Sequence, residues 1–170
     1  MITSLAQAFD AVADDEIDAV KDYVLSHPEI VNAKTFFAGG TLLHYAAAKS
    51  SPEMIRTLVT MGFDVNKPGD TYGEMPLHSS CTNDMYENAG VLLSLGAELD
   101  VSESHRNPLF GAIIGSSPRI VDLLLKAGID PDIEYQLEDG SVVNALGFAR
   151  KRGDAECEKV LLAAYASKVH

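Results

Sequence analysis

Apolar residues along the chain recur in pairs of short helical stripes, and each pair ends at a glycine. Within residues 41–62, Leu43, Ala46 and Ala47 stand at positions i, i+3 and i+4, the spacing of one buried helix face. A second stripe consists of Met54, Ile55, Leu58 and Val59. Gly62 then provides the left-handed residue on which helices commonly end. The pattern predicts a unit of helix, turn, helix and hairpin-like polar loop.

This unit repeats along the chain. Four related hexapeptides, TLLHYA, MPLHSS, NPLFGA and NALGFA, start at residues 41, 75, 107 and 144, which are 34, 32 and 37 residues apart. The glycines that end the second helices are Gly62, Gly96 and Gly128. They keep the spacings of 34 and 32 residues, and each lies 21 residues after a hexapeptide start. Two independent markers with one offset indicate a repeat of about 33 residues.

Both ends of the chain depart from the pattern, as the end units of a solenoid do. The first pair of helices is predicted at residues 5–13 and 16–25, with Ala19, Val20, Tyr23 and Val24 facing inward. The last unit has a polar side that can face water, formed by Lys151, Arg152, Glu156 and Lys159. The sequence therefore predicts one all-α solenoid domain over residues 1–170. Its five units are expected at about 2–34, 35–68, 69–102, 103–137 and 138–170.

The hexapeptides resemble the T-P-L-H-x-A motif of ankyrin repeats. His44 and His78 stand at the histidine position, and residues 96–100 (GAELD) are similar to the family's G-A-D-V-N ending. No unit holds the complete T-P-L-H, and the fourth and fifth units lack the histidine. The resemblance implies a curved array whose loops project as fingers from one edge. It also implies that other proteins bind at the finger tips and on the concave surface formed by the first helices.

The resemblance further implies that both histidine rings hydrogen-bond to loop backbone and order the fingers. His78 and Cys81 are spaced i, i+3, which is half of a metal site, but no CxxC or HxxxH completes it. Cys81 and Cys157 are expected to be buried small hydrophobes. The sequence contains no nucleophile elbow, phosphate-binding loop or dinucleotide fingerprint. We therefore expect no enzyme, no cofactor and no metal, and a metal-dependent enzyme is the weakest alternative.

Composition narrows the class of partner. The 170 residues include 25 Asp and Glu against 13 Lys and Arg, for a net charge of −12. This charge is repelled by nucleic acid and by anionic membranes. Two cysteines exclude a disulfide framework and favour a reducing compartment. Because the chain also lacks a secretory pattern and an apolar run of about 18 residues, we expect a cytoplasmic protein, monomeric when free, with no membrane partner.

Alignment of the units places candidate partner contacts on the fingers and at the ends of the first helices. The finger set is Phe36, Phe37, Tyr72, Glu74, His105 and Arg106, and Tyr135 extends its aromatic row. The ends of the first helices add Lys49, Asn83 and Ile114. Aromatic residues are enriched at binding hot spots. The alternative for Phe36 and Phe37 is that each ring packs under the next finger.

The finger between Gly128 and Asn144 is the longest, at 16 residues against 13 and 11 for the two before it. Within it, Asp139-Gly140 predicts a hairpin turn. The added length either reaches a partner or is neutral variation of a surface loop.

Acidic residues lie in or beside the fingers, at Asp70, Glu74, Asp100, Glu103, Asp132, Glu134, Glu138 and Asp139. A negative edge of this kind attracts a cationic protein. Small acidic ankyrin proteins occur in bacteria as immunity proteins to toxins, so the resemblance adds the interpretation of an inhibitor that occludes a basic protein. An adaptor that links two proteins is the alternative.

Overall fold

The computed structural model describes residues 2–33, 40–69 and 72–167, in which ten α-helices form five antiparallel pairs. The first helices of the pairs are α1 (Leu5–Ala13), α3 (Leu42–Lys49), α5 (Pro76–Thr82), α7 (Pro108–Ile114) and α9 (Ala145–Arg152). The second helices are α2 (Ile17–Ser26), α4 (Pro52–Thr60), α6 (Tyr86–Ser94), α8 (Pro118–Lys126) and α10 (Ala155–Ser167). The predicted helix at residues 16–25 begins and ends one residue later, and the five pairs lie within the five predicted units.

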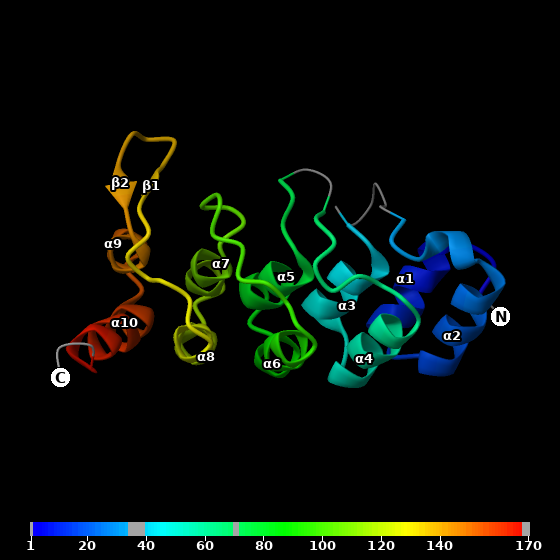
Figure 1. The fold of residues 1–170 in the computed structure, drawn as a ribbon. Coiled ribbons are helices and arrows are strands. Elements are labelled where there is room, and N and C mark those ends of the chain that lie inside the picture. Colours follow the sequence, from blue (N-terminus) through cyan, green and yellow to red (C-terminus); the bar gives the residue numbers. More distant parts are fainter. Residues whose placement is uncertain (1, 34–39, 70–71, 168–170) are drawn as a thin grey trace.

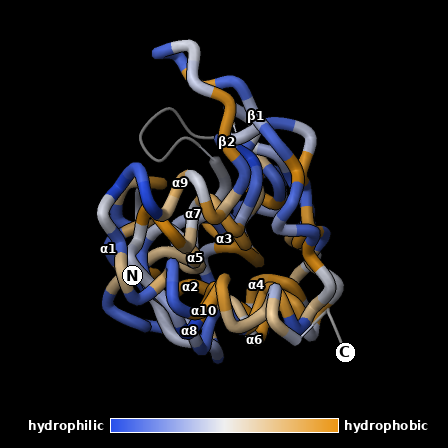
Figure 2. The backbone as a smooth tube through the Cα atoms, turned by 90° about the vertical axis from the view of Figure 1, so that its left-hand side faces the viewer, coloured by the Kyte–Doolittle hydropathy of each residue, from blue (hydrophilic) through white to orange (hydrophobic). Residues whose placement is uncertain are grey.

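The pairs stack side by side into a two-layered solenoid. First helices contact first helices, second helices contact second helices, and the connecting loops rise to one edge (Figure 1). A short 3₁₀ turn, η1 (Pro28–Ile30), follows α2. The last finger is an antiparallel hairpin of β1 (Tyr135–Gln136) and β2 (Val142–Val143), as the turn at Asp139-Gly140 predicted. Seen along the stack, the tip of this hairpin is hydrophilic (Figure 2). The prediction of an all-α solenoid is confirmed.

Capping side chains fix where many of the helices begin. The Ser51 hydroxyl accepts a hydrogen bond from the Met54 backbone N–H, and Ser117 accepts one from Ile120 in the equivalent place. A proline occupies the first position of both helices, where a missing N–H costs nothing. Thr41 and His44 form a reciprocal capping box at the start of α3. These local signals explain why the repeat could be predicted from the sequence.

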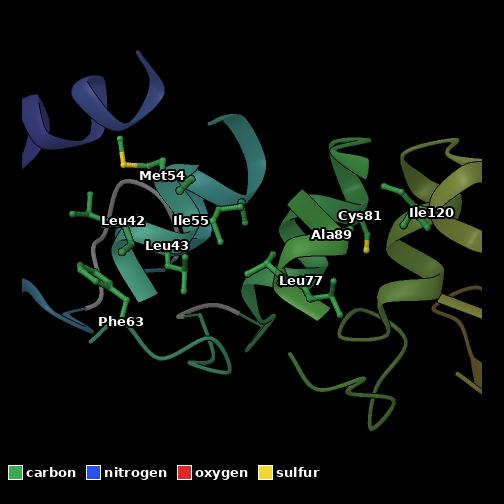
Figure 3. Packing of buried hydrophobic residues seen from close by; sticks show 14 of the residues in the cluster. Leu42, Leu43, Met54, Ile55, Phe63, Leu77, Cys81, Ala89 and Ile120 are labelled. Atoms are coloured by element: carbon green, nitrogen blue, oxygen red, sulfur yellow. The ribbon is translucent and has the colours of Figure 1, made fainter. Parts of the chain in front are cut away.

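A continuous apolar core runs between the two layers and includes Leu42, Leu43, Met54, Ile55, Leu77, Cys81, Ala89 and Ile120 (Figure 3). Both cysteines are free and fully buried, as expected, and burial raises the pKa of each thiol to about 12.

Two glycines, Gly111 and Gly115, let α7 approach α5 closely. A Cβ at Gly115 would lie 2.6 Å from the carbonyl oxygen of Cys81, and a Cβ at Gly111 would lie 2.9 Å from the His78 ring. Only glycine fits such an approach without a shift of the backbone or of the ring. This contact sets the spacing between the third and fourth units, directly beneath the fingers that carry the candidate site.

Candidate protein-binding surface

Tyr72, His105 and Arg106, three of the predicted finger residues, come together at the tips of two neighbouring fingers. The rings of Tyr72 and His105 are tilted against each other with their centroids 5.4 Å apart. The Arg106 Nε donates a hydrogen bond of 2.8 Å to the Tyr72 carbonyl oxygen. Tyr72 remains 58% exposed, so its ring is available to a partner. We call these three residues the finger-tip cluster.

The backbone at Gly73 is shaped to receive the Arg106 side chain. Gly73 has a φ of +74°, and a Cβ there would lie 2.9 Å from an Arg106 guanidinium nitrogen. Asp100 lies near this guanidinium. Burial would raise the pKa of the Asp100 carboxyl, but hydrogen bonds from Ser102 and the charges of Arg106 and His105 together lower it. The cluster is therefore a preorganised aromatic and cationic surface beside a carboxylate.

His44 holds the Glu74 side of this surface in place, as the family resemblance implied. Its Nδ1 accepts a hydrogen bond from the Thr41 backbone N–H, which leaves Nε2 as the donor to the Glu74 carbonyl oxygen at 3.1 Å. The same carbonyl accepts the backbone N–H of Gly69 at 2.8 Å. Glu74 thus closes its finger and ties it to the preceding unit through its backbone, while its side chain is only partly buried.

The expectation for His78 is wrong. Its Nε2 is buried without a hydrogen-bond partner in the described part of the chain. The following finger is shorter, and it closes on the Glu103 carbonyl, which accepts the backbone N–H groups of both Arg106 and Asn107. In this finger, the carbonyl oxygen at the position that corresponds to Glu74 therefore accepts no hydrogen bond from the His78 ring. Burial lowers the pKa of His78 to about 4, helped by the nearby charge of His105.

Tyr135 lies apart from the finger-tip cluster and has structural contacts of its own. Its hydroxyl donates to the Val101 carbonyl at 2.7 Å and accepts a hydrogen bond from the Asn107 amide at 3.1 Å. Its ring packs edge-on against Phe110, with centroids 5.1 Å apart. Burial raises the pKa of Tyr135. These contacts account for the half-buried side chain, and a partner contact at Tyr135 stays a prediction.

The predicted residues at the ends of the first helices are all exposed. The Lys49 ammonium lies 5.3 Å from the centroid of the Tyr45 ring. The Asn83 amide donates to the Ser79 carbonyl at 2.8 Å, so it caps its own helix. Ile114 is an exposed apolar side chain, 44% accessible. The ends of these helices form the floor of the surface beneath the fingers.

Sequence reasoning missed Arg152. This side chain donates from Nη2 to the Ile114 carbonyl at 3.3 Å and lies over the Phe148 ring at 5.8 Å. Arg152 stands eight residues after the helix cap Asn144, as Lys49 does after Thr41. An alignment of the first helices that includes the last unit identifies Arg152 as a floor residue. The polar side of that unit was instead expected to face water.

Three predicted residues, Phe36, Phe37 and Asp70, lie outside the described residues. The acidic residues are unevenly distributed along the array. Residues 69–102 contain six Asp and Glu and no Lys or Arg, whereas residues 35–68 contain two acidic and three basic residues. The unit with the most negative net charge is therefore the one that provides Tyr72 and Asn83.

Over the residues described, no group of three or more His, Cys, Asp or Glu side chains is placed to hold a metal ion. Within the same ranges, no helix is long and apolar enough to cross a membrane. The arrangement offers aromatic, charged and backbone groups for recognition.

A family model described as ankyrin repeats (3 copies) matches residues 8–103, which is more than half of the chain. The chain belongs to the ankyrin-repeat family, and it is a protein–protein interaction module.

Three relatives match part of this chain. Glycerophosphocholine phosphodiesterase GDE1 of Eremothecium gossypii is 33% identical over 103 residues, ankyrin repeat and SOCS box protein 5 of Oryctolagus cuniculus is 32% identical over 87 residues, and transient receptor potential channel pyrexia of Drosophila melanogaster is 30% identical over 114 residues. The matches cover 59%, 51% and 66% of this chain, but only 8%, 26% and 12% of the relatives. The chain therefore spans only a small part of each relative, and the similarity does not transfer the activity of any one of them.

Proposed function

We propose that this protein binds a basic partner protein through its finger edge and inhibits that partner by occlusion, in the manner of an immunity protein. The observation that carries the proposal is the finger-tip cluster, which presents an exposed aromatic ring on an acidic edge. Tyrosine and arginine are typical of binding hot spots. The carboxylates around the cluster would attract a cationic partner and accelerate its association. We further propose that the protein is cytoplasmic and monomeric when free, in keeping with its two reduced, buried thiols.

Partner capture from native lysate tests this proposal when wild-type and Tyr72→Ala baits are compared. We expect a basic protein on the wild-type bait, and a loss of about 2 kcal/mol or more in its affinity for Tyr72→Ala. The melting temperature should hardly change, because the ring is already exposed in the free protein. Leu162→Ala is the matched control, since Leu162 is 44% exposed and lies on α10, away from the fingers.

Salt and the remaining aromatic residues sharpen the test. Association with the partner should slow steeply as salt rises, while dissociation changes little. Phe36→Ala and Phe37→Ala should be measured in the same way for affinity and melting temperature. An acidic partner, or binding that is insensitive to salt, would contradict the proposal. So would a set of aromatic variants that change only the melting temperature.

An adaptor is the second candidate, and the surface around Leu25 favours it. Leu25 borders a cleft of about 820 Å³ that is also lined by Ile2, Ala19, Tyr23 and His27. This cleft, which Asp18, Asp22 and Ser26 also line, lies on the first unit, remote from the finger-tip cluster. If Leu25→Ala loses one captured protein while Tyr72→Ala loses a different one, the protein links two partners and the adaptor reading replaces the inhibitor.

A further inference from the structure

Four of the first helices differ from the fingers in the sign of their charged side chains. Helices α3, α5, α7 and α9, which form the floor, contain no Asp or Glu, although the whole chain has 25. Their only Lys and Arg side chains are Lys49, Arg150, Lys151 and Arg152. The finger segments 97–107 and 129–144 instead contain eight acidic residues and one basic residue. An acidic protein thus has a floor whose charged side chains are all basic.

Two of the four cations are already neutralised by carboxylates. Arg150 bonds Glu158 at 2.8 Å, and Lys151 bonds Asp139 in the hairpin finger. Hydrogen bonds from Lys151 and from Ser141 lower the pKa of the Asp139 carboxyl. Neither cation is therefore free to recognise a partner without breaking a contact of the fold.

Lys49 and Arg152 are different, because within the described ranges neither forms an ion pair with a carboxylate. Lys49 lies over Tyr45, and Arg152 lies over Phe148 and donates to the Ile114 carbonyl. The charge of Arg152 helps to lower the pKa of Asp154, which burial alone would raise and hydrogen bonds from Cys157 also lower. Contacts with rings and carbonyls hold a cation in position without pairing it directly to a carboxylate. Both cations therefore stay fixed, exposed and available to a negative group.

We infer that the partner segment bound by this surface has two oppositely charged faces: cations that meet the fingers, and carboxylates that meet Lys49 and Arg152 on the floor. The inference rests on the proposed function and refines its basic partner, since a uniformly basic segment would place its own cations against these two. Pairing of opposite charges at the fingers and at the floor would fix the orientation of the bound segment. In the reversed orientation, contacts between like charges would disfavour binding.

The spacing of the helices indicates how long this segment is. Three helix-to-helix steps separate α3 from α9 (Figure 1), and packed helices lie about 8–10 Å apart, which gives roughly 25–30 Å between Lys49 and Arg152. A helix rises 1.5 Å per residue, so about 18 residues would span that distance. The partner segment would then be a helix of about five turns, with a carboxylate near each end of its floor-facing side.

Charged paramagnetic probes test the sorting of charge on the free protein. An anionic and a cationic nitroxide are added separately at low salt, and the broadening of backbone amide signals is measured by NMR. The ratio of anionic to cationic broadening should be about threefold higher at the last turns of α3 and α9 than at the finger segments. Lys49→Glu and Arg152→Glu should abolish the difference locally. The control Arg56→Glu, an equal charge change on α4, should leave it unchanged. Equal ratios on floor and fingers in the wild type would overturn the inference.

Two synthetic helical peptides of identical composition, about 20 residues long, test the partner chemistry. One has lysines on one face and a glutamate near each end of the opposite face. The other has the same glutamates moved onto the lysine face. We expect the first to bind about tenfold more tightly, and Lys49→Glu/Arg152→Glu to remove that preference. Equal binding of the two peptides, or binding of neither, overturns the inference. If a peptide with lysines alone binds as tightly as the two-faced one, the inference fails while the proposed function, a basic partner at the fingers, stands.

Discussion

Two neighbouring junctions join similar helix pairs by different means. One lies between the second and third units, and the other lies between the third and fourth units. In the former, polar side chains of each unit bond the backbone of the other. The latter lacks the bonds of the three equivalent side chains and is held by the close approach of α5 and α7. The finger-tip cluster spans the latter junction.

Three side chains make the polar bonds of the first of these junctions. The Asn88 amide nitrogen lies 2.8 to 3.4 Å from the carbonyl oxygens at the end of α3, those of Ala46, Ala47 and Ser50. Asn66 donates to the Gly96 carbonyl at 3.1 Å and accepts the Glu98 N–H at 2.8 Å. His44 donates to Glu74. The bonds of Asn88 satisfy buried groups, which cost about 1–3 kcal/mol when left without a partner, whereas those of Asn66 lie at the surface.

One junction further along, each of these three side chains has a counterpart that makes no such bond. Ile120 stands at the position of Asn88, Asp100 at that of Asn66, and His78 at that of His44. The remaining polar contacts lie at the surface, such as the 3.8 Å pair of Arg119 and Glu87, whose side chains are both more than two-thirds exposed. Exposed pairs contribute about 0–1 kcal/mol each. The stability of the junction between the third and fourth units therefore depends on packing. The residues of its fingers are less constrained by the fold and can vary to suit a partner.

The largest effect is expected from Gly115→Ala, which challenges the close packing. The added Cβ would lie 2.6 Å from one backbone oxygen and 3.0 Å from another, so the helices must separate. We expect a loss of about 3 kcal/mol in the free energy of unfolding. Gly90→Ala is the matched control on α6, where a Cβ meets nothing within 4 Å, and it should stabilise by about 0.5–1 kcal/mol. Urea denaturation measures both, and equal effects at the two glycines would refute the packing argument.

Acid should weaken the packed junction through His78. Its pKa is about 4 in the fold against an ordinary value of 6.5, so the unfolded chain binds a proton more readily. The free energy of unfolding should therefore fall as pH is lowered from about 7 towards 4, by on the order of 3 kcal/mol. Denaturation at a series of pH values measures the slope. His78→Leu should flatten it, and a slope unchanged by this substitution would show that other groups cause it.

Exchanging each histidine for leucine compares the two junctions directly. His44→Leu removes the ring from the Thr41 N–H and the Glu74 carbonyl, and should cost about 2 kcal/mol. His78→Leu leaves no new unpaired partner, so at neutral pH its cost should be below about 1 kcal/mol. Thermal melting of both variants gives the comparison. A larger loss for His78→Leu would mean that its ring has a hydrogen bond in solution.

The smallest effect is expected from Asp100→Asn, which restores one polar bond. An asparagine there can keep the hydrogen bond from the Ser102 N–H and donate to the Gly128 carbonyl, as Asn66 does to that of Gly96. We expect a gain of about 0.5–1 kcal/mol. Glu98→Gln, an equal loss of negative charge on the same exposed finger, is the control. A gain of the same size in both variants would point to reduced charge repulsion as the cause.

Much of the fold could be predicted because its signals are local. Thr41, Ser51-Pro52 and Gly62 each act on their own helix ends, and the repeat then copies them. The hairpin at Asp139-Gly140 was predicted for the same reason. The candidate site depends on pairs distant in sequence. The Arg106 side chain reaches the Tyr72 carbonyl because the two fingers stack. No residue near Arg106 in the sequence indicates this contact.

The two histidines show this limit most clearly. His44 and His78 share a motif, and the sequence predicted one role for both. The difference arises in the following finger, whose 11 residues close on Glu103 instead of returning a carbonyl to the ring. The length of the finger could be read from the sequence. Its effect on a residue of the preceding unit could not, because that effect depends on the path of the backbone.

The bond from Arg106 to Tyr72 also has a thermodynamic consequence. It fastens the tips of two adjacent fingers, so part of their freedom of motion is lost when the protein folds and need not be lost again on association. Binding at these tips should therefore show a smaller entropic penalty than binding to independent loops. Removing the guanidinium would shift the balance of enthalpy and entropy in a calorimeter even where the affinity itself moves little.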